Sequence, residues 1–114
     1  MRVGIFDHMD CAHSVKALDG CHLNHGHTYK VEVVVAGELK DGIVIDFKLL
    51  REIARRTMNK YDHKDLSDFF EVPSCENICQ ALFADLKKDL PGLLSVRCWE
   101  GYAKWAEANA EDQA

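Results

Sequence analysis

Two stretches near the start of the chain alternate between apolar and polar residues. In residues 2–13, one parity is mostly apolar and ends in a histidine: Val3, Ile5, Met9, Cys11 and His13. In residues 27–36, one parity is aromatic or β-branched: Tyr29, Val31, Val33 and Val35. Lys30 and Glu32 occupy the other parity of that stretch. Because successive side chains of a β-strand point to opposite faces, both stretches predict strands that are buried on one face.

Two later stretches have the apolar spacing of amphipathic helices. The first helix is expected over residues 47–59, with Asp46 as its N-cap. Its apolar stripe is Leu49, Leu50, Ile53, Ala54 and Met58. The second helix is expected to begin at Pro73-Ser74 and to stop at Leu90-Pro91-Gly92. Its apolar stripe is Cys75, Ile78, Cys79, Leu82, Phe83 and Leu86.

Shorter signals complete the expected order of elements. Lys40-Asp41-Gly42 predicts a turn, Ile43-Val44-Ile45 a short strand after it, and Tyr61–Asp65 a polar loop. A further strand is expected where one parity holds Leu94, Val96, Cys98 and Glu100. The residues from Tyr102 onwards fit either a short strand or a weak helix. The expected fold class is α+β, with two helices packed on one face of an antiparallel sheet.

The composition is that of an ordinary globular protein with an acidic balance. The chain has 114 residues, 47% of them hydrophobic and 29% charged, so residues 1–114 are expected to form a single domain. A net charge of −5 argues against a nucleic-acid partner, because such binding requires neutralisation of phosphates. No apolar run approaches the ~20 residues of a bilayer-spanning helix, so no membrane partner is expected. The five cysteines are odd in number and favour thiols over a disulfide framework, as in a cytoplasmic protein.

Three histidines fall at the ends of the two expected N-terminal strands. His25 and His27 extend the apolar row of the second strand, and antiparallel pairing brings His13 beside them. Three neutral imidazoles form an open tetrahedral site in which Zn2+ keeps its fourth position for water or substrate. The alternative is a group of surface histidines at a strand end, which the continuous apolar row disfavours. The sequence therefore predicts a catalytic zinc site at His13, His25 and His27.

Three further positions carry candidate chemistry, and each has a plainer alternative. Cys21 lies four residues before His25, where a nearby dication would lower the pKa of its thiol; the alternative is a passive buried thiol. Asp62 and His63 form a carboxylate–imidazole pair suited to proton transfer, or else an ordinary loop dipeptide. Glu100 shares a largely apolar strand face and needs a partner. That partner is either a ring with two parallel N–H donors or a basic side chain.

Six short motifs occur in one order along nearly the whole chain. They are Cys11-Ala12-His13, Cys21-x-x-x-His25-Gly26-His27-x-Tyr29, Gly42-Ile43-Val44-Ile45-Asp46-Phe47, Tyr61-Asp62-His63-x-x-Leu66, Pro73-Ser74-x-Glu76-Asn77 and Val96-x-x-x-Glu100. Together they resemble the 6-pyruvoyltetrahydropterin synthase / 6-carboxytetrahydropterin synthase family, whose second branch acts in the queuosine pathway. The resemblance implies the tunnelling fold (T-fold), in which three subunits pool their sheets into one barrel and two trimers stack into a hexamer. It therefore implies a homo-oligomer with active sites at subunit interfaces.

The resemblance also implies a role for each matching residue. The implied zinc ligands are His13, His25 and His27. The implied catalytic residues are Cys21 as proton acceptor, Asp62 and His63 as its relay partners, and Glu100 as the anchor of the pterin ring. The implied substrate-binding residues are Glu100, Ser74, Cys75 and Glu76.

The residues before the histidine pair distinguish the branches of the family. A cysteine followed by three residues, as at Cys21, is similar to the 6-carboxytetrahydropterin synthases. Members that act as dihydroneopterin aldolases have a glutamate at the position held here by His22. The resemblance thus implies a zinc-dependent 6-carboxy-5,6,7,8-tetrahydropterin synthase that converts 7,8-dihydroneopterin triphosphate and releases triphosphate and acetaldehyde. The alternatives are a 6-pyruvoyltetrahydropterin synthase, which omits the carbon–carbon cleavage, and a non-catalytic zinc- or pterin-binding homologue.

Overall fold

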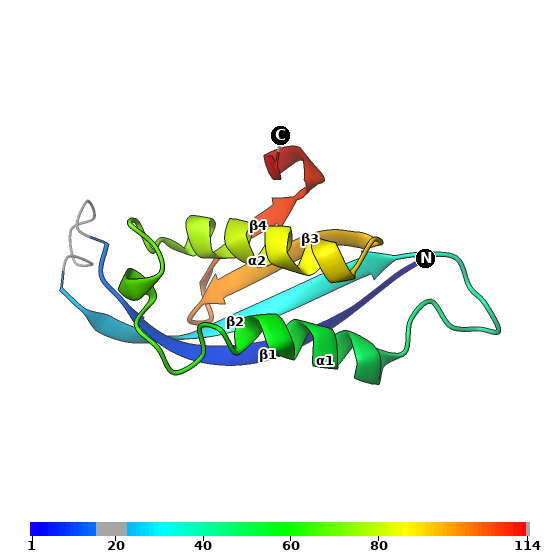
Figure 1. The fold of residues 1–114 in the computed structure, drawn as a ribbon, viewed down its shortest axis with the longest axis horizontal. Helices are drawn as coiled ribbons and strands as arrows, with labels where there is room; N and C mark the ends of the chain where they lie inside the picture. Colours follow the sequence, from blue (N-terminus) through cyan, green and yellow to red (C-terminus); the bar gives the residue numbers. More distant parts are fainter. Residues whose placement is uncertain (16–22, 114) are drawn as a thin grey trace.

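The structure describes residues 1–15 and 23–113. These residues form a four-stranded antiparallel sheet that is covered on one face by two α-helices. The computed structural model contains, in chain order, β1 (Arg2–His13), β2 (His25–Ala36), α1 (Phe47–Met58), η1 (Leu66–Asp68), α2 (Cys75–Asp89), β3 (Leu93–Glu100), β4 (Lys104–Asn109) and η2 (Ala110–Gln113). The strands follow chain order across the sheet. Both α-helices lie on the same face (Figure 1), α1 against β1 and α2 against β3 and β4. The predicted α+β arrangement is confirmed.

The first helix begins where its cap predicts, but its buried face is rotated from the expected one. The Asp46 carboxylate accepts a hydrogen bond from the Lys48 amide and caps α1. The buried residues are Leu50, Ile53, Ala54, Thr57 and Met58. The predicted burial of Leu49 is wrong, since its side chain is 47% exposed. Neighbouring helical residues are about 100° apart, so a face centred on Ala54 takes in Thr57 and leaves Leu49 outside.

The second helix matches its prediction closely. The Ser74 hydroxyl accepts a hydrogen bond from the Asn77 amide at 3.2 Å and caps α2. Every residue of the predicted stripe, from Cys75 to Leu86, is buried against the sheet. In the residues that the structure describes, no helix has both the length and the apolar character needed to cross a membrane.

Two connecting segments differ from the predictions or resolve them. The predicted short strand at Ile43-Val44-Ile45 is wrong, because only a single bridge forms there, between Lys40 and Ile43. The tight turn at Asp41 and Gly42, both with positive φ, folds the chain back on itself, and the chain then runs directly to the cap of α1. The ambiguous segment after Tyr102 resolves as β4 followed by η2.

The core lies between the helices and the sheet. Tyr29, Val31 and Val33 of β2 have no exposed surface, as their parity predicts. Between Val34 and Val35 the pairing of β2 with β3 shifts register. As a result Leu93, and not the predicted Leu94, faces the core at the start of β3.

Candidate active site

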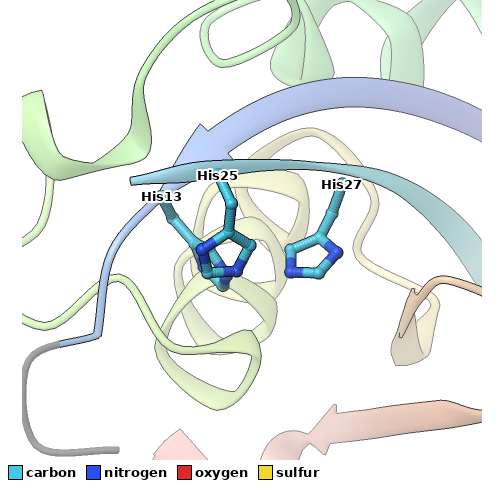
Figure 2. A group of neighbouring side chains, drawn as sticks. All are labelled: His13, His25 and His27. Atoms are coloured by element: carbon cyan, nitrogen blue, oxygen red, sulfur yellow. The ribbon is translucent and has the colours of Figure 1, made fainter. Parts of the chain in front are cut away.

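Three histidine rings converge at one end of the β1–β2 pair. The strand register places His13 directly opposite His25 and Cys11 opposite His27, so the three imidazoles leave the sheet on one face. Their ring centroids are 4.6–4.8 Å apart. Figure 2 shows His13 and His25 close together, with the His27 ring turned toward them. The structure therefore brings together the three histidines that the sequence indicated.

Backbone carbonyls fix the tautomers of two of these histidines. Nδ1 of His13 lies 2.8 Å from the carbonyl oxygen of Pro73, and Nδ1 of His25 lies 2.7 Å from that of Leu23. Because a carbonyl oxygen only accepts hydrogen bonds, each Nδ1 carries the hydrogen and each Nε2 keeps its lone pair. The two Nε2 atoms are 3.1 Å apart. Two lone pairs that face each other at this distance need a proton or a metal cation between them.

His27 completes the cluster with a buried nitrogen. Its Nε2 is 3.1 Å from Oε1 of Glu100, but the atoms lack hydrogen-bond geometry, and this nitrogen has no hydrogen-bond partner among the described residues. Burial lowers the pKa of His27; the Glu100 carboxylate opposes this effect, and His13 and His25 add to it. The ring is therefore neutral near pH 7, the form in which imidazole binds a metal.

The donor set fits a divalent metal ion that prefers nitrogen ligands. His13, His25 and His27 each offer one ring nitrogen, and the three atoms lie within 4.8 Å of one another. Two nitrogen ligands of a tetrahedral zinc ion are about 3.3 Å apart. The 3.1 Å between His13 and His25 is close to that spacing. Three protein ligands leave one coordination position for water or substrate, as in catalytic zinc sites.

The segment after α1 carries Asp62 and His63 against the edge of β1. The Asp62 carboxylate accepts a hydrogen bond from the Asp10 amide at 2.9 Å and another from the Arg55 guanidinium. The His63 amide donates to the Asp10 carbonyl at 2.7 Å, and its exposed imidazole has Nε2 3.7 Å from Oδ1 of Asp62. His63 and His27 line one cavity of about 570 Å³. The predicted relay pair thus lies at the same opening as the histidine cluster.

Glu100 ends β3 beside the histidine cluster, opposite Tyr29 of β2. Its side chain is only 13% exposed, and the nearest lysine nitrogen among the described residues, Nζ of Lys104, lies 3.9 Å from Oε1. That distance is too long for a hydrogen bond. The carboxylate therefore retains acceptor capacity for a ligand, and the contact with Lys104 does not account for its placement beside His27.

The segment Ser74–Glu76 forms the start of α2, next to Glu100. The Cys75 thiol points into the core and donates to the Cys98 carbonyl at 3.3 Å, while the Glu76 side chain is exposed. Burial, reinforced by the negative charge of Glu100, raises the pKa of Cys75 to about 12. Cys75 is thus a protonated core thiol close to Glu100. A role for this segment in lining a ligand pocket stays a prediction.

Cys21, the predicted proton acceptor, lies outside the described residues. The four cysteines that the structure does describe are buried free thiols: Cys11, Cys75, Cys79 and Cys98. Burial, together with the charges of Asp62 and Asp10, raises the pKa of Cys11 to about 12. Neither Cys11 nor Cys75 is therefore a thiolate near neutral pH, and Cys21 stays the candidate for that role.

Sequence reasoning missed the groups that orient these side chains. The carbonyls of Pro73 and Leu23 hold two of the histidines, and backbone groups carry no sequence signal. The Tyr29 hydroxyl oxygen lies 3.0 Å from Nδ1 of His13. Tyr29 lies on the same face of the strand as His25 and His27, and this parity could have predicted its place beside them. Arg55 contacts Asp62 across a turn, which the apolar stripe of α1 does not indicate.

Solved structures share this fold. The 6-pyruvoyl tetrahydropterin synthase of Caenorhabditis elegans matches with a TM-score of 0.87 over 96% of this chain and 95% of that chain, at 22% sequence identity. The Plasmodium falciparum protein with the same name gives a TM-score of 0.78 over 95% and 96%, at 21% identity. The sheet with its two covering helices is therefore the fold of the tetrahydropterin synthases.

Sequence comparison defines the family. The family model described as 6-pyruvoyl tetrahydropterin synthase matches residues 3–111. An Archaeoglobus fulgidus protein, provisionally named 6-carboxy-5,6,7,8-tetrahydropterin synthase, is 38% identical over 94% of each chain. A Pyrococcus furiosus dihydroneopterin monophosphate aldolase is 39% identical over 81% of this chain and 82% of its own. The Haemophilus influenzae 6-carboxy-5,6,7,8-tetrahydropterin synthase is 30% identical over 86% and 91%. The chain belongs to the 6-pyruvoyl tetrahydropterin synthase family, whose synthases are lyases, as its six motifs indicated.

Proposed function

We propose that this protein is a zinc-dependent 6-carboxy-5,6,7,8-tetrahydropterin synthase in queuosine-type 7-deazaguanine biosynthesis. Its substrate would be 7,8-dihydroneopterin triphosphate, and it would release triphosphate and acetaldehyde. The observation that carries the proposal is the cluster of His13, His25 and His27 with Glu100 beside it. Relatives named 6-carboxy-5,6,7,8-tetrahydropterin synthase at 30–38% identity support the choice of reaction.

The three histidines would hold the zinc ion. The hydrogen bonds from Nδ1 of His13 and His25 to backbone carbonyls orient both rings with Nε2 toward the cluster. When bound, zinc supplies a Lewis acid that polarises the side-chain oxygens of the substrate. His27 would contribute the third nitrogen from the same strand as His25, so β2 sets the spacing of these two ligands.

Glu100 would anchor the pterin ring. A pterin presents two parallel N–H donors on its amidine-like edge, and a single carboxylate accepts both. The low exposure of Glu100 strengthens such charge-assisted hydrogen bonds, because water competes poorly there. Because Glu100 lies 3.1 Å from His27, a ring anchored there would lie beside the histidine cluster.

Cys21, His63 and Asp62 would move the protons. The Cys21 thiolate accepts a proton from a carbon of the substrate side chain, and His63 supplies or removes the balancing proton. Asp62 accepts hydrogen bonds on both oxygens and has its Oδ1 3.7 Å from Nε2 of His63, so it is a fixed negative charge beside that ring.

A homo-oligomer, trimer or hexamer, would complete the sites. β1 and β4 are the edge strands of the sheet. The Asp10 carbonyl and the Ala12 amide at the edge of β1 already bond to His63 and Lys64. The His8 carbonyl at this edge accepts a hydrogen bond from Arg55. The part of β1 before His8 and the strand β4 thus remain as the edges that neighbouring sheets would join, and closing a barrel would remove both edges.

An aldolase is the second candidate, because the Pyrococcus furiosus relative named dihydroneopterin monophosphate aldolase is 39% identical. Carbon–carbon cleavage of a neopterin side chain is common to both reactions, so the histidine cluster suits either of them. The two candidates differ in the residue that accepts the proton. The aldolases of this family have a glutamate at the position of His22, whereas the candidate proton acceptor here is the preceding residue, Cys21.

Product analysis tests the proposal. The zinc-loaded protein is incubated separately with the triphosphate and the monophosphate of 7,8-dihydroneopterin, and the products are identified by mass spectrometry. The proposal expects 6-carboxytetrahydropterin, acetaldehyde and triphosphate in equal amounts. Triphosphate release without acetaldehyde would show a 6-pyruvoyl synthase instead, and cleavage of the monophosphate alone would show an aldolase. Tight pterin binding with no product would show a non-catalytic homologue.

A further inference from the structure

One arginine joins three separate parts of the chain beside the predicted proton relay. Arg55, in the last turn of α1, donates through Nε to Asn59 Oδ1 at 2.9 Å and through Nη1 to the His8 carbonyl of β1 at 2.8 Å. Its Nη2 donates to Oδ2 of Asp62. The planar guanidinium satisfies all three acceptors at once, which a lysine ammonium with a single nitrogen cannot do in this geometry.

Asp62 is held on both of its oxygens. Oδ2 accepts from Arg55, and Oδ1 accepts from the Asp10 amide at 2.9 Å. Partial burial alone would raise the pKa of Asp62, but the Asp10 amide, Arg55 and His63 together bring it below its usual value. Asp62 is therefore an ionised, immobilised carboxylate on the edge of β1.

His63 follows Asp62 in a backbone conformation that needs external support. Its φ is +61°, in the left-handed region that a residue with a side chain rarely adopts. The hydrogen bond from its amide to the Asp10 carbonyl, 2.7 Å long, holds this conformation. The neighbouring contact from the Ala12 amide to the Lys64 carbonyl, at 3.1 Å, continues the attachment to β1.

We infer that Arg55 is a positioning residue for His63. It fixes Asp62 against β1, and Asp62 in turn keeps His63 in its left-handed conformation, with the imidazole at the cavity shared with His27. The inference rests on the proposed function, in which His63 carries a proton during turnover. Arg55 itself contacts neither the cavity nor the histidine cluster.

A second metal site is the competing explanation for this cluster. Asp10, Asp62 and His63 offer ligand atoms within 4.8 Å of one another. However, both oxygens of Asp62 already accept hydrogen bonds, and Asp10 Oδ1 accepts one from the Thr28 hydroxyl. The Arg55 guanidinium supplies the positive charge that a cation would otherwise bring. The contacts of this cluster therefore favour a role in holding His63 in position over a role in binding a metal ion.

The test compares Arg55→Ala and Arg55→Lys with Arg51→Ala in the zinc-loaded protein. Arg51 lies one helical turn earlier on α1, and its side chain is 56% exposed. Within the described part of the chain its guanidinium forms one long ion pair, 3.9 Å, with Asp7. Turnover of 7,8-dihydroneopterin triphosphate, zinc content and the amide hydrogen exchange of His63 are measured on each variant. Added guanidinium ion is tested for rescue of Arg55→Ala.

The expected results separate positioning from general destabilisation. Both Arg55 variants lose about 10²-fold in kcat with little change in KM, because a displaced proton carrier affects the chemical step. His63 amide exchange rises by about ten- to hundredfold, the value of one charge-assisted hydrogen bond. Zinc content stays at the wild-type level, guanidinium partly restores kcat in Arg55→Ala, and Arg51→Ala behaves as wild type.

Other outcomes overturn the inference in distinct ways. Wild-type kcat in Arg55→Ala removes any role for Arg55 in turnover. Lost kcat with unchanged His63 exchange and no rescue shows that Arg55 acts on something other than His63. A wild-type protein that turns over none of the pterin substrates refutes the proposed function alone. In that case the exchange measurement decides about Arg55, since unchanged exchange in both variants refutes the positioning role.

Discussion

Nε2 of His13 and Nε2 of His25 lie 3.1 Å apart, although both rings are held in place from the other side by backbone carbonyls. The hydrogen bonds at Nδ1 leave a lone pair on each Nε2, and the buried Nε2 of His27 has no hydrogen-bond partner among the described residues. Buried polar atoms without partners are costly. The cluster is therefore less stable by itself than with a cation that these nitrogens share.

Metal removal is the first prediction from this arrangement. Zinc at about 100 times its dissociation constant adds about 2.7 kcal/mol to the free energy of unfolding, and the Tm of a domain of this size should fall by about 10 °C when a chelator removes it. Thermal unfolding with and without chelator measures the change. His27→Ala should bind no zinc and show no chelator effect, whereas His8→Ala, an exposed histidine on the other face of β1, should behave as wild type. One zinc per chain in His27→Ala would contradict the ligand set.

Tyr29→Phe tests the second support of the His13 ring. The Tyr29 hydroxyl lies 3.0 Å from Nδ1 of His13, and groups that orient a metal ligand typically contribute 10–100-fold to metal affinity. The carbonyl of Pro73 remains in the variant, so we expect a loss of about tenfold, at the lower end of that range. Competition with a fluorescent zinc chelator measures it. Tyr61→Phe, at a tyrosine whose ring packs against Phe69 and Phe70, is the matched control. Equal affinities in the two variants would refute the role of Tyr29.

Glu100→Gln tests the anchor of the pterin ring. The amide keeps the shape of the carboxylate but replaces one acceptor with a donor, so a ligand with two parallel N–H groups loses a charge-assisted hydrogen bond. We expect pterin affinity to fall by about 10–100-fold, measured by fluorescence titration, with zinc content unchanged. Glu107→Gln, which alters a carboxylate paired with Arg97, serves as the control. Unchanged pterin affinity in Glu100→Gln would exclude the anchoring role.

The histidine cluster was predictable because it depends only on strand periodicity. The parity of His25 and His27 with Tyr29, and the antiparallel return of β1, determine which side chains meet. The errors arise where a single residue changes the register. The shift between Val34 and Val35 moves Leu93 into the core in place of Leu94, and nothing in the local pattern marks it.

The supports of the site were not predictable, because they depend on contacts between distant segments. The Pro73 carbonyl reaches His13 only after α2 has docked on the sheet. In the sequence, Arg55 has the features of an ordinary exposed position of a helix. Only in the folded chain does the turn after α1 bring Asp62 back to it. The sequence pattern thus predicts which residues face the site, and the tertiary fold decides which groups hold them there.

Cys21→Ala tests the proton acceptor, whose position lies outside the described residues. We expect turnover to be lost while zinc and pterin binding stay at the wild-type level, because the thiol acts only in the chemical step. Cys11→Ser is the matched control, since the buried Cys11 thiol donates to the Tyr61 carbonyl and a serine hydroxyl keeps a donor there. Full turnover in Cys21→Ala would remove the thiol from the mechanism.

Asp62→Asn should lower stability in a manner that depends on pH. Hydrogen bonds from the Asp10 amide and Arg55 outweigh partial burial and hold the pKa of Asp62 below its usual value. The resulting stabilisation is fully present above the pKa of the unfolded chain, about 3.9, and is lost as the pH falls through the lower pKa of the folded protein.

The difference in unfolding free energy between wild type and Asp62→Asn should therefore be on the order of 2 kcal/mol at neutral pH and shrink below about pH 4. Denaturant unfolding of the metal-free protein measures it, so that the release of zinc in acid does not contribute. Asp68→Asn, at an exposed carboxylate with no ion pair among the described residues, should show no such difference. A difference that stays constant with pH, or grows in acid, would mean that the pairing of Asp62 with Arg55 does not stabilise the fold.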